Sequence, residues 1–165
     1  MTELTGDGIH EVCATLERLG IAFRRYDHPA VSRCAEAAQH VRNVPGVLNK
    51  SLLVESRDGQ RFLVIVPCAT RLNLKQLAED LDCRRLSFAS TAELQRRLHV
   101  NPGSVSPFGL WHDRNHEIAV VIHPDVLRQP VCQFHPNDNR ATLVLTTADF
   151  LKFLSAVNHS PRMLT

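Results

Sequence analysis

A β-hairpin whose second strand is apolar throughout is the feature that most constrains the fold of this chain. Residues 51–55 read SLLVE, residues 61–66 read RFLVIV, and the pair Asp58-Gly59 lies between the two runs. An Asp-Gly pair between two such runs is a strong hairpin signal, because glycine readily adopts the positive φ that tight hairpin turns require. The second run lacks polar alternation, which predicts a strand buried on both faces.

Helices and further strands alternate around this hairpin. Residues 9–19 carry apolar side chains at helical spacing and Gly20 follows them, which predicts a helix with a glycine stop. Interleaved helices and hairpins predict a mixed β-sheet in an α/β (α+β) architecture. The other predicted helices are 32–41 after Ser32, 73–81 after Asn73, 90–98 after the capping box of Ser90 and Glu93, and 147–157; the other predicted strands are 21–26, 84–89, 117–123, 131–134 and 141–145.

The length and composition predict one globular domain over residues 1–165. Hydrophobic residues make up 44% and charged residues 22%, which is ordinary for a soluble protein of this size. Nineteen basic residues against 17 acidic ones give a net charge of +2, too mild for a protein that wraps nucleic acid. A local rim for a few phosphates remains possible, with most of its candidates expected to be solvated surface: Arg24, Arg25, Arg71, Lys75, Arg84, Arg85, Arg96, Arg97 and Arg140.

The five cysteines predict free, reduced thiols. They are odd in number, lie far apart and form no C-x-x-C pair: Cys13, Cys34, Cys68, Cys83 and Cys132. The N-terminus lacks the layout of a signal peptide and no apolar run approaches the length of a membrane span, so we expect a cytoplasmic protein without membrane contact. Cys68 and Cys132 lie in strand-like runs and are expected in the core.

Residues 103–110, GSVSPFGL, form the first candidate site. Gly103 and Gly109 can adopt backbone angles closed to other residues, and Pro107 stiffens the bend. Such a loop can turn successive backbone N–H groups toward an anion or a developing oxyanion. The alternative is that the loop only connects two elements, as most Gly/Ser/Pro loops do.

Lys50 and His135 are the second and third candidates. Lys50 opens the first hairpin strand, where its ammonium can point into a cleft and hold a phosphate or a polarised carbonyl; the alternative is an edge lysine that discourages strand pairing. His135 ends a strand and begins a polar turn, so it can act as a base or orient a hydroxyl, or simply belong to the turn. His28 lies in a similar turn and is expected to line the cleft.

Other chemistries find less support in the sequence. His112 and His116 are four residues apart but are separated by a turn-like segment and lack a third ligand, so we expect no metal. None of the serines lies in a G-x-S-x-G nucleophile elbow. Cys34 near His28 is read as a packed thiol rather than a nucleophile.

Taken together and in this order, the motifs resemble the YbaK/ProX family of free-standing aminoacyl-tRNA deacylases, which are related to the editing domain of bacterial prolyl-tRNA synthetases. The resemblance covers about residues 8–157 and implies that family's fold, a mixed, partly barrel-like sheet flanked by helices. The carrying segments are YDHPAV at 26–31, KSLL at 50–53, RLNLK at 71–75, GSVSPFGL at 103–110 and HPNDNRAT at 135–142. The last two are more similar to the ProX branch, which clears alanine from proline tRNA, than to the YbaK branch, which clears cysteine.

The resemblance implies hydrolysis of an aminoacyl ester without metal or cofactor. Lys50 matches the family's functional lysine, Gly103 and Pro107 match its G-x-x-x-P loop, and His135 matches a histidine near the substrate amine or ribose. The implied partners are the acceptor end of mischarged tRNA and prolyl-tRNA synthetase, for a monomer or weak homodimer. The further substrate-binding residues expected are Ser51, Ser104, Val105, Ser106, Phe108, His28 and Asn139, and Val47, Leu48 and Leu52 are expected as apolar pocket walls.

Two positions depart from the family pattern. Ser51 stands where an asparagine usually follows the lysine, and His123 stands where an aspartate is common. The leading hypothesis is therefore a deacylase acting on alanyl-tRNA(Pro), or on cysteinyl-tRNA(Pro) or another aminoacyl-tRNA. The alternatives are a module that binds aminoacyl-tRNA or a synthetase without hydrolysis, and a small-molecule esterase or amidase, which the missing elbow disfavours.

Overall fold

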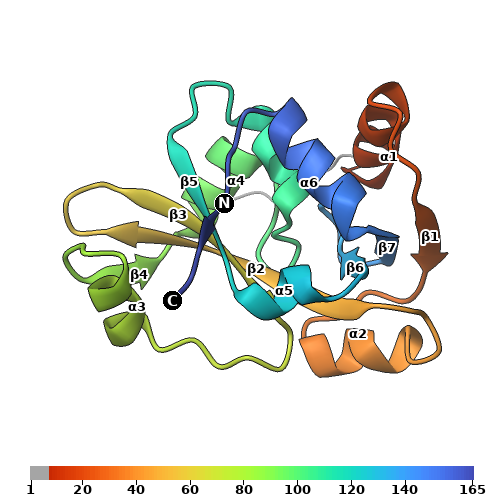
Figure 1. The fold of residues 1–165 in the computed structure, drawn as a ribbon, viewed down its shortest axis with the longest axis horizontal. Coiled ribbons are helices and arrows are strands. Elements are labelled where there is room, and N and C mark those ends of the chain that lie inside the picture. The colour runs from red at the N-terminus through yellow and green to blue at the C-terminus, as the bar shows by residue number, and fades with distance from the viewer. Residues whose placement is uncertain (1–7) are drawn as a thin grey trace.

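The computed structural model describes residues 8–165 and places eight strands in one mixed sheet that crosses the middle of the molecule (Figure 1). The strands are β1 (Arg24–Asp27), β2 (Val47–Ser56), β3 (Arg61–Pro67), β4 (Leu86–Phe88), β5 (Ile118–Ile122), β6 (Val131–Phe134), β7 (Ala141–Thr146) and β8 (Arg162–Met163). Their order is β1-β7-β6-β2-β3-β5-β8, open at both ends, with β4 paired to β2 beside this path. The predicted mixed α/β class is confirmed.

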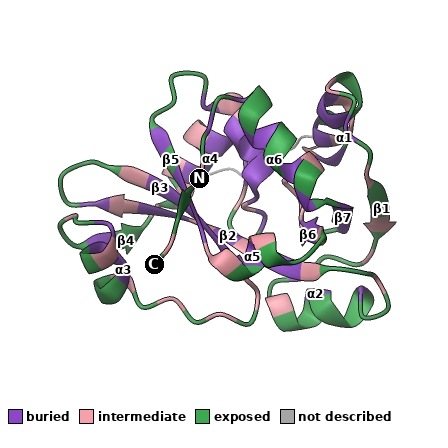
Figure 2. Cartoon of the chain, viewed as in Figure 1, coloured by how far each residue is buried: buried purple, intermediate pink, exposed green. Residues whose placement is uncertain are grey.

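Helices lie on both faces of the sheet. The main core packs α1, α4, η1, α5 and α6 on one face, and a second cluster packs α3 on the other; the buried residues form the purple centre of Figure 2. A third, smaller cluster joins α2 to β2. The helices are α1 (Gly8–Arg18), α2 (Cys34–His40), α3 (Leu74–Asp80), α4 (Thr91–Leu98), the 3-10 helix η1 (Pro107–His112), α5 (Pro124–Arg128) and α6 (Thr147–Ala156).

The predicted hairpin is confirmed as β2 and β3, antiparallel with Lys50 opposite Val66 and Val54 opposite Phe62. Because side chains alternate along a strand, Val64 and its neighbours two residues away face the α3 cluster, while Leu63 and Ile65 face the main core. β3 is thus buried on both faces, as its apolar run predicts. Each such side chain stabilises the fold by about 1.5–3 kcal/mol.

The second edge of β2 is shared between two partners, and this arrangement positions the site. Val47 and Leu48 pair with β6, whereas residues 54–56 pair with β4. Between them, residues 49–53 have no strand partner on this edge within the described chain. A ten-residue strand with a gap in the middle of one edge leaves room for other groups beside it.

Most of the predicted elements are present, with shifted ends. Asn73 caps α3 by accepting hydrogen bonds from the amides of Lys75 and Gln76, as predicted. The helix predicted from Ser32 begins instead at Cys34, and the flanking Arg33 makes no side-chain cap. Residues 21–23 precede β1 rather than belong to it, because pairing with β7 starts at Arg24.

Three short elements were not predicted. Residues 107–112 form η1 rather than a simple loop, because Pro107 fixes the first helical φ and the Ser106 hydroxyl caps the Phe108 amide. α5 follows His123, whose ring accepts the Asp125 amide. β8 adds to β5 near the end of the chain. None of these has enough residues for a periodic signal.

The expectation of five reduced thiols is wrong. Cys34 at the start of α2 and Cys68 after β3 form a disulfide, with Cα atoms 5.6 Å apart. The pair lies 34 residues apart in sequence, and only the fold of α2 onto the hairpin brings the two together. Cys132 is buried, as predicted, while Cys68 packs at the margin of the small cluster. No helix among residues 8–165 is long and apolar enough to cross a membrane.

Candidate active site

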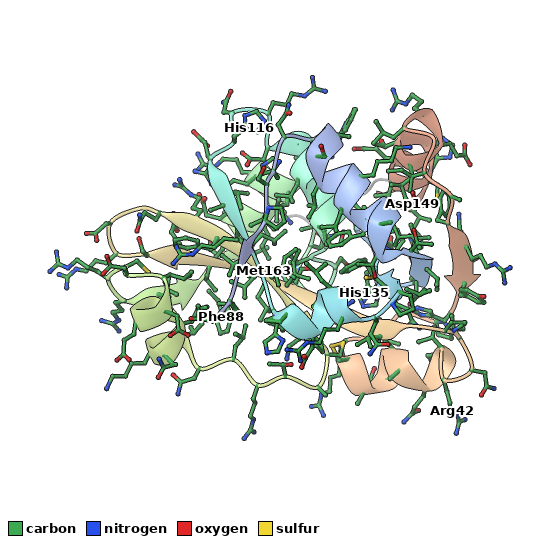
Figure 3. All side chains as sticks on the ribbon, in the orientation of Figure 1. Arg42, Phe88, His116, His135, Asp149 and Met163 are labelled. Carbon is green, nitrogen blue, oxygen red and sulfur yellow. A yellow bond between two sulfur atoms is a disulfide. The ribbon has the colours of Figure 1, made fainter. Side chains whose placement is uncertain are left out.

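A cavity of about 370 Å³ opens at the gap in the edge of β2. Three segments form its walls: the middle of β2, the loop before η1, and the approach to α2. His135, which follows β6, closes it and is labelled in Figure 3. The lining residues are Val31, Ser32, Arg33, Cys34, Lys50, Ser51, Leu52, Gly103, Val105 and His135.

The loop wall depends on one left-handed backbone position. Gly103 has φ +86°, and a Cβ atom placed there would meet nothing within 4 Å. Glycine is therefore needed for its backbone angle rather than for lack of space. The amides of Gly103 and Val105 donate no hydrogen bond to any residue in the described chain, whereas the Ser104 amide donates to the carbonyl of Asn101. Two unpaired N–H groups thus belong to residues that line the cavity.

The same loop is fixed from behind by buried contacts. The Ser106 hydroxyl donates to Asn137 Oδ1 at 2.6 Å, which ties this loop to the turn after β6. Phe108 is only 2% exposed and packs edge-on against Phe134 and Phe153 in the main core. Gly109 does not have a positive φ; a Cβ there would lie 3.0 Å from the Cβ of Leu98 in α4, so the backbone passes close to that helix.

His135 lines the cavity and has one unpaired ring nitrogen. Its Nδ1 lies 3.1 Å from the carbonyl oxygen of Ala141. A carbonyl oxygen only accepts, so Nδ1 carries the hydrogen and the neutral ring has its lone pair on Nε2. Burial lowers the pKa of His135, which favours this neutral form, and Nε2 makes no hydrogen bond within residues 8–165. The ring can accept a hydrogen bond from a substrate amine, hydroxyl or water.

His28 and Asn139 support the cavity without lining it. His28 bonds the carbonyl of Pro29 through Nδ1 and Thr142 Oγ1 through Nε2, and its ring meets that of His135 edge-on at 6.3 Å. Asn139 donates to the carbonyl of Val31 at 2.7 Å. These contacts hold the segment before α2 against the β6–β7 turn, so both residues position a wall of the cavity.

Lys50 and Ser51 are consecutive on β2 and differ in their surroundings. Lys50 is half-buried on the face of β2 shared with Leu52. Ser51 is 5% exposed, and its hydroxyl oxygen has no hydrogen-bond partner within the described chain. An unpaired buried hydroxyl costs about 1–3 kcal/mol, which a hydrogen bond from a bound ligand would offset.

The entrance to β2 is shaped by a residue that sequence reasoning missed. The side-chain amide nitrogen of Gln133, a buried residue of β6, lies 2.9–3.2 Å from the carbonyl oxygens of residues 44–46. Gly46 there has φ +96°, and a Cβ would lie 2.7 Å from the carbonyl oxygen of Val131. In the sequence, only the Pro45-Gly46 pair indicates that the backbone passes so close to Val131.

The structure therefore brings together Lys50, Ser51, Gly103, Val105 and His135 around one cavity. It places Pro107 and Phe108 in the core, and Ser106, His28 and Asn139 behind the walls. Ser104 is a buried residue of the loop and does not line the cavity. His123 caps α5 and does not line the cavity either. Arg33 was missed, and Cys34 was interpreted only as a packed thiol, because the short segment around the start of α2 carries no signal of a site. No group of three or more histidine, cysteine or acidic side chains in residues 8–165 is arranged to hold a metal ion.

Comparison with known proteins places this arrangement in a family. Residues 28–153 match the family model described as the aminoacyl-tRNA editing domain. The matched segment contains every residue that lines the cavity. The chain belongs to the aminoacyl-tRNA editing domain family, as the sequence resemblance predicts, and it is an enzyme of the aminoacyl-tRNA deacylase class.

Individual relatives agree with this placement. The chain is 32% identical over 151 residues to the prolyl-tRNA editing protein ProX of Acetoanaerobium sticklandii, covering 91% of this chain and 92% of the relative. It is 29% identical to the multifunctional Ser/Thr-tRNA deacylase ProXp-y of Escherichia coli, with 92% of each covered. A crystal structure described as a candidate trans-editing enzyme for prolyl-tRNA synthetase superposes with a TM-score of 0.75 at 24% identity, covering 98% of this chain and 99% of that one. The last comparison confirms the fold.

Proposed function

We propose that this protein hydrolyses the ester of mischarged tRNA in trans, after release from prolyl-tRNA synthetase, with alanyl-tRNA(Pro) as the leading substrate. The observation that carries the proposal is that Lys50 and His135 line one cavity together with Gly103 and Val105, two loop residues whose amides are unpaired within the described chain. An aminoacyl ester is already activated, so an oriented water and donors for the developing oxyanion suffice. The names of the relatives support the reaction class. We place the protein in the cytoplasm, where tRNAs are charged.

The residues divide the chemistry as follows. Water oxygen bonds to the ester carbonyl carbon, and the Gly103 and Val105 amides stabilise the charge that develops on the carbonyl oxygen. The bond to the ribose oxygen then breaks, that oxygen takes up a proton, and the products are the free amino acid and deacylated tRNA. Lys50 pairs with the terminal phosphate or the carbonyl region. Neutral His135 accepts a hydrogen bond from the substrate amine or a ribose hydroxyl.

The proposed selection against the cognate amino acid is steric exclusion in this second pocket. A synthetase pocket built for proline cannot fully reject alanine, because one methylene is worth only about 1–3 kcal/mol. A second pocket can instead admit the smaller side chain and exclude the larger. Leu52 of β2 and Val105 of the loop before η1 are apolar residues that line the cavity and would carry this exclusion.

Serine is a second candidate for the amino acid that is cleared. The Ser51 hydroxyl is buried without a partner beside the cavity, so a hydroxyl on the substrate side chain would satisfy it. A relative 29% identical is named as a Ser/Thr-tRNA deacylase. Alanine would leave this hydroxyl unpaired, so the ratio of the deacylation rates for seryl-tRNA and alanyl-tRNA reports what Ser51 contributes.

Single-turnover deacylation of a panel of tRNAs charged with alanine, serine, threonine, cysteine and proline tests the proposal. The wild type is expected to clear one or more of the small residues and to spare proline. Lys50→Ala should lower the rate by about 100-fold or more, as removing an electrostatic stabiliser does. Lys152→Ala, at an exposed lysine of α6 that does not line the cavity, should leave the rate unchanged.

Two outcomes would overturn the proposal. Equal rates for the wild type and Lys50→Ala would remove Lys50 from the mechanism. Tight, salt-sensitive binding of tRNA with no turnover on any member of the panel would make the protein a binding module instead.

A further inference from the structure

Phe88, the last residue of β4, is the large apolar side chain most exposed to solvent in residues 8–165. It is 58% exposed, against 42% for Met163 and 37% for Leu151. It belongs to none of the three buried clusters. Figure 3 labels Phe88 in the part of the molecule where β4 and α3 lie. A phenyl ring in this position does not contribute to the core.

The register of β4 places Phe88 beside the cavity. Phe88 pairs with Val54 of β2, and side chains two residues apart on a strand share a face. Leu52, which lines the cavity, therefore lies on the same face as Phe88, on the adjacent strand. Such diagonal neighbours are about 7–8 Å apart. Phe88 thus flanks the cavity at the end of the β2 gap where β4 ends.

The charges around β4 favour a polyanion. The turn before β4 brings Arg57 beside Arg84 and Arg85, because the Arg57 amide donates to both of their carbonyls. Of these three side chains, only Arg84 lies within 4 Å of a carboxylate in the described chain, at 3.8 Å from Asp58. Unpaired guanidinium groups near an exposed aromatic ring suit nucleic acid, whose bases stack on aromatic side chains while its phosphates pair with cations.

The chemistry of the substrate explains why a ring is needed there. In aminoacyl-tRNA the ester is carried by the ribose of the 3′-terminal nucleotide, so the base of that nucleotide is only one sugar away from the reacting carbon. When the aminoacyl group occupies the cavity, the base must lie at its rim. We propose that Phe88 is the stacking platform for the terminal base of tRNA and so positions the ester beside Lys50. The inference rests on the proposed function.

Phe88→Ala should raise KM for a charged tRNA minihelix by about five- to 150-fold and change kcat little, because stacking acts on binding. Phe88→Trp should retain or tighten binding. Met163→Ala, at another exposed apolar residue, is the matched control and should change neither constant. Thermal unfolding of the variants confirms that they fold.

The substrate side provides a second readout. A minihelix whose terminal base has been removed should bind the wild type as weakly as the intact minihelix binds Phe88→Ala. On this abasic minihelix, Phe88→Ala should lower the affinity little further. An unchanged KM, or a loss of equal size on both substrates, would overturn the platform. An effect seen only when prolyl-tRNA synthetase is added would make Phe88 a protein-docking residue instead.

The Kd of the uncharged minihelix separates this inference from the proposed function. Base-dependent weakening by Phe88→Ala with no turnover by the wild type would contradict the deacylase proposal and leave the platform standing. Normal turnover with no effect of Phe88→Ala on Kd would contradict the platform alone.

Discussion

Two of the three walls of the cavity, the loop before η1 and the approach to α2, are held in place by different forces. The loop wall at residues 103–105 continues into η1, where Phe108 is buried between two aromatic rings of the main core. The opposite wall at residues 31–34 rests on a small cluster and on the disulfide between Cys34 and Cys68. The buried residues of that cluster are Val31, Ala37, Val41 and Leu48.

This difference fits two functions that the proposed mechanism assigns to the pocket, oxyanion stabilisation and enclosure of the amino acid. The loop carries the unpaired amides, and amides that stabilise an oxyanion must not move during the reaction, so attachment to the main core suits them. The opposite wall need only enclose the amino acid and can tolerate a weaker attachment. The loop wall is therefore held by the aromatic core. The wall at residues 31–34, here called the α2 wall, is held by the small cluster, the disulfide and the hydrogen bond from Asn139 to Val31.

The largest effect is expected where the loop wall meets the core. Phe108→Ala should lower the free energy of unfolding by about 3–5 kcal/mol, because it leaves a cavity between Phe134 and Phe153. Chemical denaturation measures this loss. Phe88→Ala removes a ring of the same kind from an exposed position and should change stability by no more than about 0.5 kcal/mol. Equal losses at the two positions would contradict the assignment of the loop wall to the core.

Breaking the disulfide should affect the α2 wall. Removing it with Cys34→Ser and Cys68→Ser should cost about 2–4 kcal/mol, since the bond closes a loop of 34 residues. Amide hydrogen exchange should then rise in α2 and in residues 31–33 while η1 stays protected. Cys83→Ser, at a free cysteine outside the cavity, should change neither. Faster exchange in both walls would show that they are not held independently.

The smallest effect concerns pH. Burial, and to a lesser extent the neighbouring His28, lowers the pKa of His135, while Asp138 and the bond to Ala141 oppose the shift. In the unfolded chain the ring titrates near the usual value of about 6.5. Below that pH the unfolded state binds a proton that the folded state does not yet take up, so stability falls as the pH falls.

Denaturation between pH 5 and 8 measures this dependence, and His135→Gln should make it shallower. The pKa of His112 is also lowered, mainly by burial. His112→Gln is therefore the matched control, and it reports how much of the pH dependence of stability comes from His112. A curve unchanged by His135→Gln would contradict the buried, neutral ring that the mechanism uses.

The sequence predicts those parts of the fold that rest on periodicity and local chemistry. The β2–β3 hairpin follows from an Asp-Gly turn between two apolar runs, and the start of α3 follows from the capping side chain of Asn73. Both signals lie within a few residues of what they determine. α5 and β8 are too short for such a signal, and their positions depend on pairing and capping contacts made after the chain has folded.

The site could be predicted in part for a similar reason. Lys50, Gly103 and His135 have residue types that point to chemistry, although Lys50 lies inside β2, which begins at Val47, and does not open the strand as predicted. Arg33 and Cys34 reach the same cavity only because α2 folds back onto the hairpin, and no local pattern encodes this. Phe108 illustrates the opposite case: its place in a family motif suggested substrate contact, while its apolar ring lies in the core.

The interrupted edge of β2 also has a consequence for how such proteins diversify. The strand is locked in register by β3 along its length and by β6 and β4 near its ends, so residues 50–52 can change without shifting the sheet. Residues 103–105 similarly change the opposite wall without touching the aromatic core. Substitutions at these two places can therefore reshape the cavity while the strand register and the aromatic core stay as they are.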